Sequence, residues 1–144
     1  MYEIDLSGKM ALIFGIANER SIAWAIAEKL HLAGAQLAFS YQDERLKGRV
    51  SKLADTLGGA LLVQCDVSDD QQIASLFGEI VGQAGGIDLM VHSVAYAARD
   101  DLGGDFSETG RKGFHTAMDI SAYSLLPLVR HASPLMEKKG GGSI

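Results

Sequence analysis

The sequence has 144 residues, of which 47% are hydrophobic and 22% charged, as in one globular domain with a sizeable core. Its net charge of −5 argues against a nucleic-acid partner, because binding phosphates requires a basic face. No apolar run is long enough to span a membrane, residues 1–6 show no secretion signal, and the lone cysteine, Cys65, excludes a disulfide framework. We therefore expect a cytoplasmic protein with neither a nucleic-acid nor a membrane partner.

Four short apolar runs predict strands at residues 10–14, 36–41, 60–64 and 88–92. A helix lies between the first two runs. It begins at Ser21 and ends before Gly34. Its predicted buried face consists of Ile22, Ile26, Leu30 and Ala33.

Three further helical segments follow in the sequence. An apolar stripe over residues 46–57 predicts the second helix, and Ser68 with Gln71 forms a capping-box pattern that opens the third. A long helical region covers residues 109–137, where Pro127 should kink or break the helix because it lacks a backbone donor.

This alternation of strands and helices predicts an α/β fold, a Rossmann-type doubly wound parallel sheet with strand order 3-2-1-4. A nucleotide crevice is expected between strands 1 and 4. Residues 140–144 resemble a turn into a fifth strand, so we expect the sheet to be incomplete at the C-terminus. Residues 1–144 are then the N-terminal part of a single dinucleotide-binding domain.

Residues 15–23 join the first strand to the first helix, where a dinucleotide pyrophosphate binds to free N–H groups at the positive end of a helix. Gly15 allows a sharp turn, and Ser21 can offer its hydroxyl and a helix-terminal N–H to phosphate. The segment lacks the G-x-G-x-x-G pattern, so an ordinary strand-to-helix turn capped by Ser21 is the alternative.

Polar or small residues also follow the other strands. Gln42 follows the second strand, where a side chain commonly contacts the adenosine ribose. Asp66 and Val67 follow the third strand, where adenine would lie, although Asp66 alone could equally be a turn aspartate before Ser68. Ser93 is small enough to let the backbone after the fourth strand lie against the nicotinamide ribose. All of these strand ends converge on one crevice.

These segments together resemble enoyl-acyl-carrier-protein reductases of the FabI type, a divergent branch of the short-chain dehydrogenases/reductases. The resemblance extends over essentially all 144 residues. The first loop is two residues longer than the usual T-G-x3-G-x-G, and Ser93-Val94-Ala95 replaces the usual N-N-A-G. The matching motifs are Gly15-x5-Ser21-Ile22-Ala23, Tyr41-Gln42, Gln64-Cys65-Asp66-Val67, His92-Ser93-Val94-Ala95-Tyr96-Ala97 and Asp119-Ile120-Ser121-Ala122-Tyr123-Ser124.

The resemblance implies NADH-dependent reduction of the trans-2 double bond of an enoyl thioester on acyl carrier protein, in fatty acid elongation, by a homotetramer. It implies NAD(H) contacts at seven positions, namely Gly15, Ser21, Ile22, Gln42, Asp66, Val67 and Val94. Ser93, which follows the fourth strand, is the eighth expected NAD(H) contact. It implies substrate contacts at Ala97 and, in the same loop, Tyr96. The catalytic tyrosine and lysine are expected in a Tyr-x6-Tyr-x6-Lys arrangement beyond Ile144, so none is expected in this chain.

Two other functions are compatible with the sequence. One is a ketoreductase of the same superfamily, which would carry a serine followed by Tyr-x3-Lys. The other is a non-catalytic NAD-binding module, since fold does not determine function. The four histidines are scattered and indicate no metal site. Gln42-Asp43-Glu44 predicts NADH rather than NADPH, because the 2′-phosphate requires a nearby cation.

Overall fold

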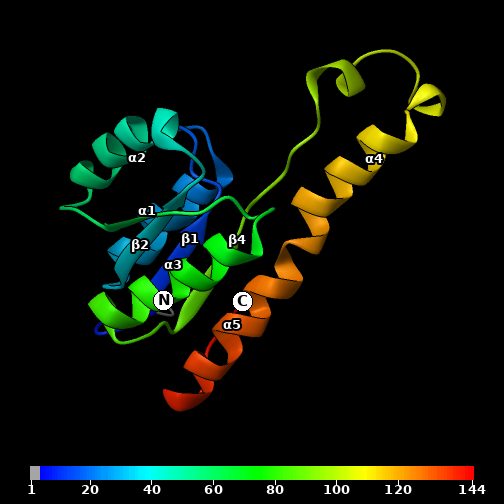
Figure 1. Cartoon of the computed structure of the whole chain (residues 1–144). Coiled ribbons are helices and arrows are strands. Elements are labelled where there is room, and N and C mark those ends of the chain that lie inside the picture. The colour runs from blue at the N-terminus through cyan, green and yellow to red at the C-terminus, as the bar shows by residue number, and fades with distance from the viewer. Residues whose placement is uncertain (1–3) are drawn as a thin grey trace.

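The computed structural model describes residues 4–144 and has a parallel four-stranded sheet at its centre (Figure 1). The strands are β1 (Met10–Phe14), β2 (Gln36–Tyr41), β3 (Leu61–Gln64) and β4 (Leu89–His92). Their order is β3-β2-β1-β4, which confirms the predicted Rossmann-type topology. The third and fourth strands begin one residue later than predicted.

Helices cover both faces of this sheet. The helices α1 (Ile22–Leu32) and α2 (Glu44–Thr56) pack on one face, and α3 (Asp70–Ala84) and α5 (Leu125–Lys138) pack on the other. All five residues of β1 are buried, as expected for a central parallel strand. The sheet is therefore doubly wound, with a separate apolar core on each face.

The predicted buried face of α1 was wrong at Ile22, whose side chain is 74% exposed. The residues buried against the sheet are Ala23, Trp24 and Ala27, and the Trp24 ring meets Phe39 edge to face at 6.3 Å. Small alanines let the helix lie close to the strands. The first six residues of α1 are all apolar, so the sequence pattern could not indicate which of them face the core.

The predicted capping box of α3 was also wrong. Asp69 is the N-cap residue, and its carboxylate accepts hydrogen bonds from the N–H groups of Gln71 at 2.9 Å and Gln72 at 3.2 Å. Ser68 instead donates its N–H and its hydroxyl to Asp66. The helix consequently begins one residue later than the pattern predicted.

The long helical region comprises α4 (Arg111–Met118), a π-helical turn η3 (Asp119–Tyr123) and α5. In this turn the Ser124 N–H reaches the Asp119 carbonyl, five residues back, at 3.1 Å. The predicted irregularity lies just before Pro127, which is buried in the first turn of α5. Two short 3-10 turns, η1 (Arg99–Leu102) and η2 (Phe106–Glu108), precede α4, and this part of the chain extends away from the sheet (Figure 1).

Ser143 pairs in parallel with Leu89 at the outer edge of β4. Its N–H donates to the Asp88 carbonyl at 3.0 Å, and its carbonyl accepts from the Met90 N–H at 2.9 Å. This pairing agrees with the predicted turn into a fifth strand position. No helix among residues 4–144 is both long and apolar enough to cross a membrane.

The Asp88 carboxylate ties the same edge of the sheet together. It accepts from the Met10 N–H at 2.9 Å and from the ammonium groups of Lys139 at 2.6 Å and Lys9 at 3.3 Å, with only 5% of its side chain exposed. Burial alone would raise the pKa of Asp88, but these three donors outweigh it and hold the pKa below its usual value. The charged carboxylate thus joins β1, β4 and the end of α5.

Candidate functional site

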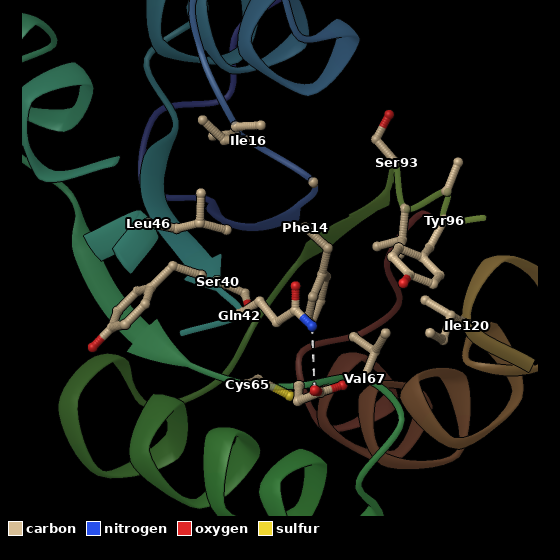
Figure 2. Close-up of a pocket in the computed structure, with 16 residues that line it drawn as sticks. Phe14, Ile16, Ser40, Gln42, Leu46, Cys65, Val67, Ser93, Tyr96 and Ile120 are labelled. Carbon is tan, nitrogen blue, oxygen red and sulfur yellow. Dashed lines mark hydrogen bonds between the residues drawn. The ribbon is translucent and has the colours of Figure 1, made fainter. Parts of the chain in front are cut away.

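A pocket of about 200 Å³ lies at the carboxyl ends of the four strands (Figure 2). This is the position at which open parallel sheets bind ligands. Most of the predicted site residues line it: Gly15, Gln42, Asp66, Val67, Ser93, Val94 and Tyr96.

Three predicted residues lie outside this lining. The Ile22 side chain points into solvent, Ala97 is half-buried, and Ser21 lies at the start of α1. The structure thus brings together the strand-end residues. The contacts of Ile22 and Ala97 rest on the family resemblance, and that of Ser21 rests also on its place at the start of the first helix.

Gly15 lies in backbone contact with the segment that follows β4. Its φ of +99° falls in the left-handed region, and a Cβ built on it would overlap the backbone carbonyl of Ser93. The Ser93 N–H in turn donates to the Phe14 carbonyl at 3.3 Å. A residue without a side chain is therefore required where the ends of β1 and β4 meet.

The loop between β1 and α1 is organised by Ser21. The Ser21 hydroxyl accepts hydrogen bonds from the N–H groups of Ala17 at 3.0 Å and Asn18 at 3.1 Å, and it makes no side-chain cap to α1. Asn18 in turn accepts from the Arg20 N–H at 2.8 Å. Because the first N–H groups of a helix have no partner within it, the loop holds a polar, positive helix end beside the pocket.

Gln42 and Asp66 meet across the ends of β2 and β3. The Gln42 Nε2 donates to Asp66 Oδ2 at 3.3 Å, drawn as a dashed line in Figure 2. Burial would raise the pKa of Asp66, but hydrogen bonds from Ser68 and Gln42 outweigh it and lower the pKa. Asp66 therefore stays charged as an acceptor. It also holds the turn at Ser68, so it both lines the pocket and has the role of a turn aspartate.

The η3 turn contacts the segment after β4. The Ser121 hydroxyl accepts from the Tyr96 N–H at 2.9 Å and donates to the Tyr96 carbonyl at 3.1 Å. His92 Nε2 lies 2.8 Å from the Ser124 hydroxyl, which donates to the Ile120 carbonyl at 2.7 Å. Ser93, Tyr96 and Ile120 consequently lie together along one side of the pocket (Figure 2).

The prediction of pocket-lining residues from the sequence missed several apolar ones, namely Phe14, Ile16, Leu46 and Ile120. Phe14 could have been found from its position as the last residue of β1. Cys65 also lines the pocket, and burial, with smaller contributions from Asp66 and Asp69, raises the pKa of its thiol to about 12. The thiol is therefore protonated at neutral pH.

Within residues 4–144, no three or more His, Cys, Asp or Glu side chains gather in a way that could hold a metal ion. The polar groups of the pocket are amide, hydroxyl, carboxylate and backbone groups, beside apolar walls. This arrangement suits an organic ligand with hydrogen-bonding and aromatic parts.

The known proteins that this chain resembles, in sequence and in structure, include several enoyl-(acyl-carrier-protein) reductases. The chain is 51% identical to the enoyl-(acyl-carrier-protein) reductase (NADH) FabI of Nostoc sp., over 98% of this chain and 55% of that protein. It therefore spans about half the length of the curated relatives it matches.

Two solved structures resemble the fold closely. The Bacillus cereus enoyl-acyl carrier protein reductase, with NADP+ and indole naphthyridinone, has a TM-score of 0.88 at 45% identity, covering 95% of this chain and 54% of that chain. The Anaplasma phagocytophilum enoyl-(acyl-carrier-protein) reductase, in complex with NAD, has a TM-score of 0.87 at 39% identity, covering 91% and 50%.

The sequence model of the enoyl-(acyl carrier protein) reductases matches residues 15–144, which include every helix and strand after β1. The predicted resemblance is thus confirmed over nearly the whole chain. By its sequence, its strand order and the pocket at its strand ends, the chain belongs to the enoyl-(acyl carrier protein) reductase family.

Proposed function

We propose that this chain is the NADH-binding, N-terminal part of an enoyl-acyl-carrier-protein reductase. The reaction is reduction of the trans-2 double bond of an enoyl thioester during fatty acid elongation. The observation that carries the proposal is the convergence of all four strand ends on one pocket, with Gly15 against the Ser93 backbone. The proposal includes acyl carrier protein as partner, a homotetramer and a cytoplasmic location.

The residues of the pocket fit a nicotinamide dinucleotide. Gln42 and Asp66 offer an amide and a carboxylate to the adenosine, and Val67 offers an apolar surface beside them. The loop ordered by Ser21 presents the N-terminus of α1 to the pyrophosphate. The small residues Ser93 and Ala95 leave room for the nicotinamide ribose. When bound, NADH supplies the hydride for the double bond.

We propose NADH rather than NADPH on the charges that follow β2. Asp43 and Glu44 would repel a 2′-phosphate, and the Arg45 guanidinium is held by Asp43 Oδ2 at 2.6 and 3.1 Å. Relatives have been crystallised with either NAD or NADP+, so family membership alone does not decide the preference. The preference rests on this chain's own carboxylates.

The catalytic tyrosine and lysine belong, in this proposal, to residues that follow Ile144. Tyr96 is a substrate contact on the rim of the pocket, where its backbone is bound by Ser121. Tyr123 lies on the η3 turn with its side chain about half exposed, outside the pocket lining. Neither tyrosine is assigned a proton-transfer role.

The test uses the intact reductase, in which this chain is joined to the second half that its relatives possess. NADH oxidation is followed with crotonyl thioester and, separately, with acetoacetyl thioester. Turnover of the enoyl substrate alone supports the proposal. Turnover of the ketoacyl substrate alone would instead identify a ketoreductase, and NADH binding without either reaction would identify a non-catalytic module.

A further inference from the structure

The segment Ser93–Ala95 is bracketed by two hydroxyl groups from the η3 region. Just before it, His92 Nε2 lies 2.8 Å from the Ser124 hydroxyl. Just after it, both backbone groups of Tyr96 are bonded to the Ser121 hydroxyl at 2.9 and 3.1 Å. The three residues between these anchors all line the pocket.

The π-helical turn makes the Ser124 anchor directional. An α-helix would direct the Ser124 N–H to the Ile120 carbonyl, but here this N–H reaches Asp119 and the Ser124 hydroxyl donates to Ile120 at 2.7 Å. The single hydroxyl proton is thus used, so the contact with His92 requires the ring to donate its Nε2–H. Ser124 is 0% exposed, so both bonds of its hydroxyl are made inside the protein.

The Ser121 hydroxyl bonds both backbone groups of Tyr96, as a neighbouring strand would. A hydroxyl can donate once and accept, and Ser121 uses both capacities on Tyr96, at a sequence separation of 25 residues. Ile120, which directly precedes Ser121 on η3 and accepts a hydrogen bond from Ser124, is itself part of the pocket lining. The η3 turn therefore contributes Ile120 to the pocket lining and, through Ser121, fixes the backbone of Tyr96 on the same side of the pocket.

We propose that Ser121 and Ser124 are positioning residues, which hold Ser93–Ala95 at the distance that a bound nicotinamide ribose requires. The proposal rests on the dinucleotide function proposed above and adds a structural role for η3. Among residues 4–144, the hydrogen bonds of Gln42 and Asp66, which form the adenosine end, involve neither serine. Removal of the hydroxyls should consequently affect one end of the ligand and spare the other.

The test compares two ligands on the intact reductase. NADH reaches both ends of the pocket, whereas ADP lacks both the nicotinamide and its ribose. For Ser121→Ala and for Ser124→Ala we expect NADH to bind about tenfold more weakly, which corresponds to about 1.4 kcal/mol. The affinity for ADP should change less than about twofold, since its adenosine and pyrophosphate contacts are untouched.

Two matched variants serve as controls. Thr116→Ala removes a neighbouring hydroxyl that bonds only to the Lys112 carbonyl of its own helix, so both affinities should stay at the wild-type values. Ser121→Thr keeps the hydroxyl and should restore NADH binding. In turnover, the alanine variants should raise KM for NADH more than they lower kcat.

The outcomes separate this inference from the function on which it rests. Equal weakening of NADH and ADP binding would show a general structural role and overturn the positioning proposal. Unchanged NADH affinity in both alanine variants would overturn it as well. A wild-type reductase that binds neither ligand would instead refute the dinucleotide function itself.

Discussion

At the scale of single residues, backbone geometry and charge determine what the pocket accepts. Gly15 is required for two separate reasons, its positive φ and the nearness of Ser93. A comparison with another glycine of positive φ separates these reasons. Gly58 has a φ of +81°, but a Cβ added there would meet no atom within 4 Å, so it has the strain without the contact.

Gly15→Ala should weaken NADH binding by more than about tenfold, because a Cβ must displace the Ser93 backbone, which lines the proposed nicotinamide side of the pocket. Gly58→Ala should leave NADH affinity unchanged and cost only stability, about 1 kcal/mol. Fluorescence titration and urea unfolding of both variants measure the two effects. Equal NADH affinity for wild type and Gly15→Ala would contradict the close approach.

Cofactor choice is also a residue-scale property. Asp43→Asn keeps a side-chain oxygen for the N-cap of α2 but removes one negative charge and releases Arg45. The preference for NADH over NADPH should fall about two- to fivefold, since exposed charges contribute modestly. Asp55→Asn, a charge loss in the last turn of the same helix, is the control. Competitive titration of both cofactors measures the ratio, and an unaltered ratio would show that Asp43 does not oppose the 2′-phosphate.

At the scale of elements, strands were predicted better than helix ends. The runs of β1 and β2 have the predicted bounds. β1 is a continuous apolar stretch that ends before Gly15, and β2 is a mainly apolar stretch that ends before Gln42-Asp43. The start of α3 was misplaced because Ser68 and Asp69 are both good cap residues, and only the bond from Ser68 to Asp66 decides between them. Local pattern cannot reveal that bond.

The candidate site also has residues that the sequence pattern could predict and contacts that it could not. The strand-end residues Gln42 and Asp66 could be predicted, since parallel strands bring their carboxyl ends to one edge of the sheet. The link between Ser121 and Tyr96 could not, since it joins residues 25 apart through a π-helical turn. Ile22 followed from the resemblance alone; its side chain is exposed, and its cofactor contact stays a prediction.

The N-cap of α3 at Asp69 can be tested through the stability of the fold. Asp69→Ala removes the acceptor for two N–H groups at the start of α3 and should lower the urea midpoint of unfolding. Ser68→Ala leaves this cap intact, so it should lower the midpoint less and instead weaken the hold on Asp66. If Ser68→Ala lowered the urea midpoint more than Asp69→Ala, Ser68 rather than Asp69 would be the N-cap of α3.

At the scale of the whole molecule, Asp88 connects parts that are distant in sequence. Lys9 precedes β1 and Lys139 follows α5, and both ammonium groups meet this one carboxylate beneath β4. Met10 donates to it as well, so the start of the central strand and the end of the last helix share one acceptor. Removing the carboxylate leaves two lysines and an N–H without their partner, which costs more than the loss of an exposed ion pair.

The pH dependence of stability follows from the direction of the Asp88 pKa shift. The folded-state pKa is lower than the unfolded value, so the carboxylate stabilises the fold above the unfolded pKa, about 3.9, and this contribution is lost as the pH falls through the folded pKa. Asp88→Asn should therefore lower the free energy of unfolding by about 1–3 kcal/mol at neutral pH. The difference from wild type should shrink steadily below about pH 4. Urea unfolding across this range measures it, with the exposed Asp55→Asn as the control that changes charge alone. A difference that stays constant down to about pH 2 would show that Asp88 acts through packing rather than through its charge.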